Sequence, residues 1–344
     1  MTTVLLDARK ARDFGIGRYV LGLLRALTRR GEFRLSAVVF PGDAGLLPEG
    51  VTPVVSRARP YTAGELVAVR GAIAREKPDL FHAPHYVVPF FPPRATVVTI
   101  HDLMHLSRPE HATLPKRAYA TWMLRRAVKL SSRIITVSDA VGREVAGAFP
   151  GASAKLTVIP NGVGPEFRPG TSAPDGAPYL LFLGNDKPHK NLDGLLAAFA
   201  ILRAESPGLR LLLAGVPPGR RAGPGVEALG FVPDEAIPTL VAGARALLLP
   251  SFAEGFGLPV LEAQAAGTPV ACSDLPALRE ASGGAAVFFD PHDEASIARA
   301  ASGLLGDAAA RARLRDAGLA HAAAFTWDRA AERTAAVYRE AAGR

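Results

Sequence analysis

Two acids and a glycine turn make residues 250–268 the stretch of the chain best suited to chemistry. Glu254 and Glu262 bracket a turn with glycines at positions 255 and 257, and Pro259 follows where a helix can begin. Glycines let backbone amides approach a phosphate closely, and a helix N-terminus favours negative charge. A phosphate site alone needs no neighbouring acids, whereas a site for a phosphorylated sugar and a ribose does. The spacing therefore predicts a site that binds both.

A second segment of the same half supplies a cation. Lys190 follows an apolar run that ends at Gly184, and it directly precedes a helix expected from about residue 192. An ammonium group and helix amides can converge there on a diphosphate. Taken alone, the segment is more typical of an ordinary charged loop between a strand and a helix. The interpretation as a phosphate site is strengthened by the first segment. In a doubly wound sheet, the turn at Lys190 and the glycine turn after Glu254 both lie at the carboxyl edge, where ligands bind.

The elements that position these residues are those of parallel α/β sheets, because short apolar runs alternate with amphipathic stretches in both halves. We expect strands at 4–6, 35–40, 80–82, 97–100, 134–137, 156–159, 179–183, 210–214, 228–232, 246–249, 269–271 and 286–289. We expect helices at 18–29, 114–130, 139–149, 192–204, 237–242, 259–266, 296–305, 309–324 and 328–342. A stretch rich in proline and glycine at 164–178 indicates a linker. The predicted domains are 1–165 and 166–325, with a last helix in 326–344 that returns to the first domain.

Length and composition fit two globular domains. The chain has 344 residues and a single cysteine, Cys272, and no apolar run approaches the roughly 20 residues of a membrane span. These features predict a cytoplasmic protein. The net charge of +8 is uneven, since residues 1–165 carry 23 Lys and Arg against 12 Asp and Glu. The excess indicates either an anionic partner or general solubility. Nucleic acid is disfavoured, because the few aromatic residues form no recognisable module with the basic ones.

Histidines and a basic helix raise two further alternatives. Five of the eight histidines lie between residues 82 and 111, but no spacing with a nearby acid matches a metal site, so we expect none. The expected helix 114–130 interleaves basic residues with Tyr119, Trp122, Met123 and Leu124. It is either a helix with one buried face or an interfacial helix that contacts an anionic membrane, and the pattern leaves both open.

Together these segments resemble the retaining glycosyltransferase family 4, of GT-B fold. The resemblance covers essentially the whole chain. It rests on Glu254 to Pro259 with Glu262, on Gly184 with Lys190, and on the N-terminal motifs Gly15-Ile16-Gly17-Arg18 and His101-Asp102. It implies two doubly wound, Rossmann-like α/β domains that face each other across a cleft, with the acceptor on the N-terminal domain and the nucleotide sugar on the C-terminal one.

The resemblance also implies a role for each matching residue. Glu262 would bind the ribose hydroxyls, Glu254 the donor sugar, and Lys190 the diphosphate. Backbone amides of the donor site would come from Phe256, Gly257 and Leu258, beside Gly184 and Asn185. Many relatives have an arginine, serine or threonine where this chain has Asn185, so a second phosphate-binding cation is in doubt. In the N-terminal domain, His101 would reach the donor sugar, and Gly15, Gly17 and Arg18 would form an acceptor or phosphate loop.

The implied activity is transfer of a hexose from a nucleotide diphosphate sugar to a glycan or lipid-linked acceptor in surface polysaccharide synthesis. The resemblance weakly favours GDP-mannose as the donor. Transfer would proceed with retention of anomeric configuration, without a metal or other cofactor. A sugar-nucleotide epimerase or hydrolase on the same scaffold is the alternative. A nicotinamide dehydrogenase is disfavoured, because Val20 stands where the third glycine of a dinucleotide fingerprint belongs.

Overall fold

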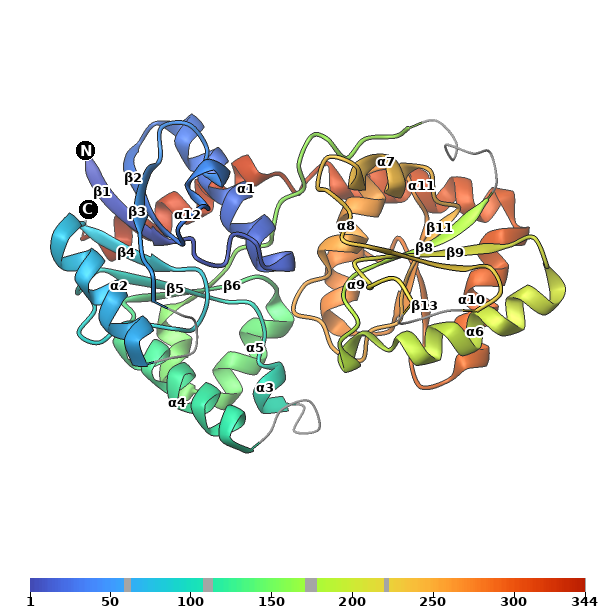
Figure 1. The fold of residues 1–344 in the computed structure, drawn as a ribbon, viewed down its shortest axis with the longest axis horizontal. Helices are drawn as coiled ribbons and strands as arrows, with labels where there is room; N and C mark the ends of the chain where they lie inside the picture. The colour runs from blue at the N-terminus through green and yellow to red at the C-terminus, as the bar shows by residue number, and fades with distance from the viewer. Residues whose placement is uncertain (59–62, 108–113, 171–177, 220–222, 344) are drawn as a thin grey trace. The chain divides into compact units, whose positions relative to one another are not determined.

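The computed structural model describes residues 1–58, 63–107, 114–170, 178–219 and 223–343 (Figure 1). The chain forms two compact units. One comprises Met1–Gly162 with Thr326–Arg344, and the other comprises Val163–Phe325. Each unit is built on its own parallel sheet with helices on both faces. Part of the predicted linker, residues 171–177, lies outside the described residues.

The sheet of the first unit has the order β3-β2-β1-β4-β5-β6-β7, and all its strand pairs are parallel. Its strands are β1 (Thr2–Asp7), β2 (Phe33–Val39), β3 (Thr52–Val55), β4 (Leu80–Ala83), β5 (Thr96–Ile100), β6 (Arg133–Thr136) and β7 (Leu156–Val158). The chain builds outward from β1 in one direction up to β3 and then continues from β4 on the other side of β1. The order of connection therefore reverses between β1 and β4, which is where doubly wound sheets bind ligands.

Alternation along the strands of this unit places two helical layers against the sheet. On β1, Val4 and Leu6 join one core cluster and Leu5 joins the other. The first cluster includes residues of α1 (Phe14–Arg30) and α12 (Trp327–Ala341). The second includes residues of α2 (Ala63–Glu76), α4 (Leu114–Leu130) and α5 (Asp139–Ala148). The short helix α3 (Met104–Ser107) precedes α4, and 3₁₀ turns lie at Ala44–Leu46 and Pro150–Lys155.

A buried polar network fixes the returning helix α12 to the sheet of the first unit. The His82 ring bonds to the Tyr338 hydroxyl through Nδ1 (2.6 Å) and to the Thr99 hydroxyl through Nε2 (2.9 Å). Tyr19 of α1 bonds to the same Thr99 hydroxyl at 2.8 Å. Burial, together with the nearby His101 and His85, lowers the pKa of His82 to about 3, so its ring is neutral at physiological pH. The network thus ties α1, β4, β5 and α12 together without a buried charge.

The α1–α12 contact depends on a glycine. A Cβ atom at Gly22 would collide with the indole ring of Trp327, the first residue of α12. We expect Gly22→Ala to lower the free energy of unfolding by about 1–3 kcal/mol, because the core must shift to admit the methyl group. Urea unfolding measures the change. Gly71→Ala in α2 is the matched control, since its added Cβ meets nothing within 4 Å and alanine favours helix. Equal stability of the two variants would contradict this account of the contact.

The second unit has a six-stranded parallel sheet of order β10-β9-β8-β11-β12-β13. Its strands are β8 (Tyr179–Leu183), β9 (Arg210–Ala214), β10 (Val226–Gly230), β11 (Ala246–Leu249), β12 (Val270–Ser273) and β13 (Val287–Phe289). Helices α6 (Leu192–Glu205) and α10 (Glu294–Gly306) contribute to one core cluster. Helices α7 (Ile237–Ala242), α8 (Leu258–Ala265) and α9 (Pro276–Ser282) contribute to the other, and α11 (Ala308–Ala322) packs on α8.

All the predicted strands and helices are present; five have the predicted bounds, and the others differ by up to four residues at an end. The predicted strand 228–232 is wrong by two positions at each end, because β10 ends at Gly230, whose φ of 69° turns the chain out of the sheet. The prediction also missed β3, α2, α3 and α9. Ser138 caps α5 by accepting a hydrogen bond from the Val141 amide, as a serine before a helix is expected to do.

Candidate functional site

The structure brings together the predicted cation and one of the predicted acids of the second unit. Lys190 lies in the 3₁₀ turn after β8, and Glu254 lies in the loop after the neighbouring strand β11. Lys190 Nζ donates a 2.6 Å hydrogen bond to Glu254 Oε1, and both side chains are mostly buried, at 13% and 10% exposure. Adjacent parallel strands deliver both residues to one edge of the sheet, as the sequence predicted.

Glu254 is oriented by a second donor that the sequence analysis missed. The Ser251 hydroxyl is fully buried and donates to the same Glu254 Oε1 at 2.6 Å. Both hydrogen bonds therefore fall on one carboxylate oxygen, which leaves Oε2 to accept a hydrogen bond from a ligand hydroxyl. Serine three residues before the acid was visible in the sequence, but nothing in its type or spacing separates it from a loop serine.

The glycine turn has the geometry expected of an amide-lined helix start. Gly257 caps α8 with a φ of 105°, a conformation that favours glycine, and its Cβ would lie 2.5 Å from Leu278. Leu258 and Pro259 open the helix. Phe256 is buried and packs against Phe325 at the end of the unit, with ring centroids 6.4 Å apart. The turn is thereby held in a shape that presents backbone amides at the helix N-terminus.

The remaining predicted donor residues lie on the same elements. Glu262 is on α8 and is 2% exposed, so this carboxylate is held inside the unit. Gly184 directly follows β8, and a Cβ there would lie 3.0 Å from the Phe182 ring and at an ordinary contact distance of 3.8 Å from Lys190 Cε, so the Phe182 ring is what crowds this position. Asn185 follows it, half-buried, and within the described part of the chain its Oδ1 has no hydrogen-bond partner.

The predicted glycine loop of the first unit is wrong in one respect. Gly15 and Gly17 lie inside the first turn of α1, not in a loop before it, and the loop itself is 8–13. Gly17 is required by packing, because a Cβ would collide with the carbonyl oxygen of Ala11. Arg18 follows in the same helix, half-buried. The pattern was misread because a glycine in a helix and a glycine in a turn look alike in sequence.

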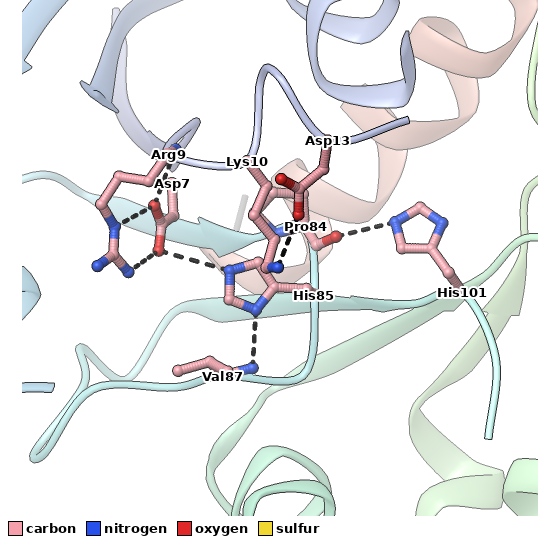
Figure 2. Close-up of polar contacts among 8 residues, drawn as sticks. All are labelled: Asp7, Arg9, Lys10, Asp13, Pro84, His85, Val87 and His101. Carbon is pink, nitrogen blue, oxygen red and sulfur yellow. Dashed lines mark hydrogen bonds and ion pairs between the residues drawn. The ribbon is translucent and has the colours of Figure 1, made fainter. Parts of the chain in front are cut away.

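His101 lies directly after β5, as predicted, and its tautomer follows from its contacts. Its Nε2 is 2.8 Å from the Pro84 carbonyl oxygen, which can only accept, so Nε2 carries the proton and Nδ1 is an acceptor (Figure 2). Tyr19 stacks edge-on against the ring, with centroids 4.8 Å apart. Burial lowers the pKa of His101 to about 4, so the ring is neutral at physiological pH.

His82 and His85 lie near His101, on and after β4. Both ring nitrogens of His82 are bonded in the buried network, and His85 follows the end of β4 by two residues. His111 lies outside the described residues. Across the ranges that the structure describes, no group of three or more His, Cys, Asp and Glu side chains is arranged to hold a metal ion.

The basic helix α4 buries one of its faces, and its other face carries an exposed aromatic residue. Met123 and Leu124 are buried in the core, whereas Trp122 is 45% exposed. The Arg126 guanidinium lies over the rings of Trp122 and Phe90, 5.1 Å and 5.0 Å from their centroids. Of the helices within the described ranges, none is both long and apolar enough to cross a bilayer.

Comparisons with known proteins agree with this architecture. The model of "Glycosyl transferases group 1" matches residues 164–321, and that of "Glycosyltransferase Family 4" matches residues 15–167. The O-antigen chain mannosyltransferase B of Escherichia coli is 31% identical over 293 residues, which cover 78% of this chain and 76% of that protein.

Two solved structures share the fold at low sequence identity. Sucrose-phosphate synthase from Thermosynechococcus elongatus superposes with a TM-score of 0.81 at 19% identity, covering 99% of each chain. HepE of Anabaena in complex with UDP-glucose superposes with a TM-score of 0.76 at 18% identity, covering 99% of this chain and 100% of that one.

Proposed function

Because the chain belongs to glycosyltransferase family 4, we propose that it transfers a hexose from a nucleotide diphosphate sugar to a hydroxyl group of a glycan or lipid-linked acceptor. The observation that carries the proposal is the 2.6 Å contact of Lys190 with Glu254 beside the glycine turn at the start of α8. A cation, a carboxylate and helix amides at one sheet edge suit a diphosphate with a sugar attached.

The chemistry of the proposed step follows from these groups. Lys190 has three donors, so it can keep its bond to Glu254 and also donate to phosphate oxygens. Together with the amides at the start of α8, it would stabilise the negative charge that develops on the leaving diphosphate. Glu254 Oε2 would accept from a sugar hydroxyl and hold the anomeric carbon in place. We propose retention, with the diphosphate taking the acceptor proton as the new bond forms on the same face, and no metal. The assignment of His101 to the donor sugar rests on the family resemblance.

GDP-mannose is the donor that we favour. The support is the E. coli relative, which is described as a mannosyltransferase, together with the preference for GDP-mannose that the resemblance in sequence implies. HepE, which binds UDP-glucose, makes UDP sugars the competing class. A thermal-shift screen of GDP, UDP, ADP and dTDP sugars separates them: GDP-mannose is expected to raise the melting temperature most. A larger shift with a UDP sugar would replace this donor without affecting the rest of the proposal.

A substitution of Glu262 tests donor binding separately from turnover. We expect Glu262→Gln to raise the Kd for the donor about tenfold, because it replaces a charge-assisted bond to ribose by a neutral one. Turnover at saturating donor should change little, because the ribose contact is the same in the ground state and the transition state. Isothermal titration with the bare nucleotide diphosphate measures the effect, and the 2′,3′-dideoxy nucleotide is the control. An unchanged Kd in the variant would remove Glu262 from the site.

The reaction itself is tested by following the donor and product by NMR. Transfer with retention gives a product whose anomeric configuration matches that of the donor sugar. An epimerase or hydrolase would consume the donor at full rate with no acceptor present, and that outcome would replace the transferase proposal.

We also propose that the first unit meets an anionic membrane through α4. The support is the excess of basic residues in residues 1–165 and the exposed Trp122 beside Arg126. Flotation with vesicles containing anionic phosphatidylglycerol at low salt should carry the protein upward, and Trp122→Ala should reduce the bound fraction. Absence of binding to these vesicles would end the membrane proposal.

A further inference from the structure

A cluster of charged and imidazole side chains occupies the carboxyl ends of β1, β4 and β5 in the first unit (Figure 2). Asp7 is the last residue of β1, His85 follows the end of β4 by two residues, and His101 directly follows β5. These three strands are adjacent in the sheet, and the order of connection reverses between β1 and β4. The cluster therefore lies at the point of a doubly wound sheet where ligands bind. The proposed donor chemistry uses only His101 of this group.

Asp7 is held as a buried carboxylate. Arg9 donates to both of its oxygens, from Nε to Oδ1 at 2.8 Å and from Nη2 to Oδ2 at 2.6 Å, and the two side chains are 1% and 2% exposed. Burial alone would raise the pKa of Asp7, but Arg9 and, to a smaller extent, His85 outweigh it, so the net pKa is lowered. Asp7 is thus an ionised acceptor fixed in position at neutral pH.

His85 is held as a donor that faces this carboxylate. Its Nδ1 accepts a 3.1 Å hydrogen bond from the Val87 amide, so the proton of the neutral ring must be on Nε2. Burial lowers the pKa of His85 to about 3, which keeps the ring neutral. The Nε2–H group points toward Asp7 Oδ2 at 3.8 Å, too far for a hydrogen bond (Figure 2). Although His85 is only 4% exposed, Nε2 has no hydrogen-bond partner among the residues that the structure describes.

The 3.8 Å separation leaves no room for an atom between Nε2 and Oδ2, but a hydroxyl oxygen beside this line can meet both atoms. An oxygen about 2.8 Å from each atom can accept from His85 and donate to Asp7 at the same time, which bridges a 3.8 Å separation. A carboxylate cannot do this, because it has no proton to give Asp7, and a phosphate would bring a second negative charge against the Asp7 carboxylate. The charges also balance, since Asp7 pairs with Arg9 and Asp13 with Lys10 at 2.9 Å. The surroundings therefore favour a neutral polyhydroxyl ligand over an anion.

We propose that Asp7 and His85 form a hydroxyl-binding subsite for the acceptor sugar, in which His85 Nε2–H donates to one hydroxyl group and Asp7 Oδ2 accepts its proton. This subsite rests on the proposed transferase function and deepens it, because it assigns the sugar that receives the hexose to the carboxyl edge of β1 and β4. The Lys10 side chain reaches toward His85 from the loop above it (Figure 2). Its ion pair with Asp13, which is 52% exposed, must move aside to admit the ligand.

The test compares two substitutions of one residue. His85→Phe keeps a planar ring and removes the Nε2–H donor, whereas His85→Gln places an amide N–H near the same point. In assays with methyl glycosides as acceptors, we expect the Phe variant to raise the acceptor KM about tenfold, the worth of one hydrogen bond. The Gln variant should recover most of the loss. Hydrolysis of the donor without acceptor should be unchanged in both, because it does not use this subsite. His105→Gln, at an exposed position in the same unit, is the control.

A binding measurement gives an independent readout. In full-length protein labelled with ¹⁵N-histidine, the Nε2–H resonance of His85 should shift on titration with a methyl glycoside from the panel, and inorganic phosphate should not shift it. A panel in which no glycoside moves this resonance overturns the subsite, and an unchanged acceptor KM in His85→Phe shows that only water fills the gap. Equal losses of transfer and of donor hydrolysis would show a structural role instead. Failure of the transferase proposal is distinct, because wild-type protein would then transfer no sugar to any acceptor, whether or not it consumed the donor.

Discussion

Replacing Lys190 with methionine is expected to lower kcat for sugar transfer by about two to three orders of magnitude. Lys190 is the cation that hydrogen-bonds Glu254 at the edge of the second sheet, and methionine keeps the length of the side chain but not its charge. A group that stabilises charge only as it develops on the leaving diphosphate affects the transition state more than the ground state. The KM for the donor should therefore rise much less than kcat falls. Steady-state kinetics with the donor found in the thermal-shift screen measure both.

The control for this substitution is Lys77→Met, which removes an exposed lysine from the first unit. Its kinetics should match wild type. Glu254→Gln is informative beside Lys190→Met, because it keeps the hydrogen bond from Ser251 while it removes the negative charge. If Lys190→Met kept wild-type kcat with an intact fold, the catalytic assignment at this sheet edge would be wrong.

Replacing Asp7 with asparagine is expected to lower the free energy of unfolding by about 3–5 kcal/mol, because the Arg9 guanidinium stays buried without its counter-charge. The effect depends on pH in a defined direction. The folded pKa of Asp7 lies below its unfolded value, so the ion pair stabilises the fold above the unfolded pKa, near 4, and is lost as pH falls through the folded pKa. The difference in free energy of unfolding between wild type and variant should therefore be largest at pH 7 and become smaller in acid. Urea unfolding at several pH values measures it.

Two comparisons give this prediction its control. Asp328→Asn breaks the surface pair with Arg29, where the side chains are 64% and 59% exposed, and should cost no more than about 1 kcal/mol. The double variant Asp7→Leu with Arg9→Met should be more stable than Asp7→Asn, since it removes the unpaired charge. A loss in Asp7→Asn no greater than that in Asp328→Asn would show that the buried pair is not needed for stability.

The fold was predictable where burial makes a strand apolar on both faces. The runs at Tyr179–Leu183 and Ala246–Leu249 were predicted to the residue, because central strands of a parallel sheet read as continuous apolar segments. The edge strand Thr52–Val55 was missed, since three of its four residues are exposed and it contains Pro53, which is typical of edges. The local sequence of this strand does little to determine its position. The position is determined by pairing with β2.

The residues of the two candidate sites were likewise predictable only in part. Lys190 and Glu254 could be predicted as neighbours, because each follows a strand of the same sheet and the carboxyl ends of adjacent strands meet. The Asp7, Arg9 and His85 cluster could not, because it depends on β1 and β4 being neighbours, and residues 33–55 that form two other strands separate them along the chain. An Asp-Ala-Arg sequence gives no sign that its acid will be buried.

The tie between His82 and Tyr338 has a consequence for how the protein is made. Ribosomes deliver a chain from its N-terminus, and domains generally fold as they emerge. The first unit cannot do so fully, because the apolar face against which α12 packs, including Leu23, Leu27 and Phe33, has no cover until residue 338 has left the exit tunnel. The second unit needs no later segment and can fold first. During translation the first unit is therefore a partly folded intermediate with an exposed apolar face. Chaperones that bind nascent chains should bind to this face.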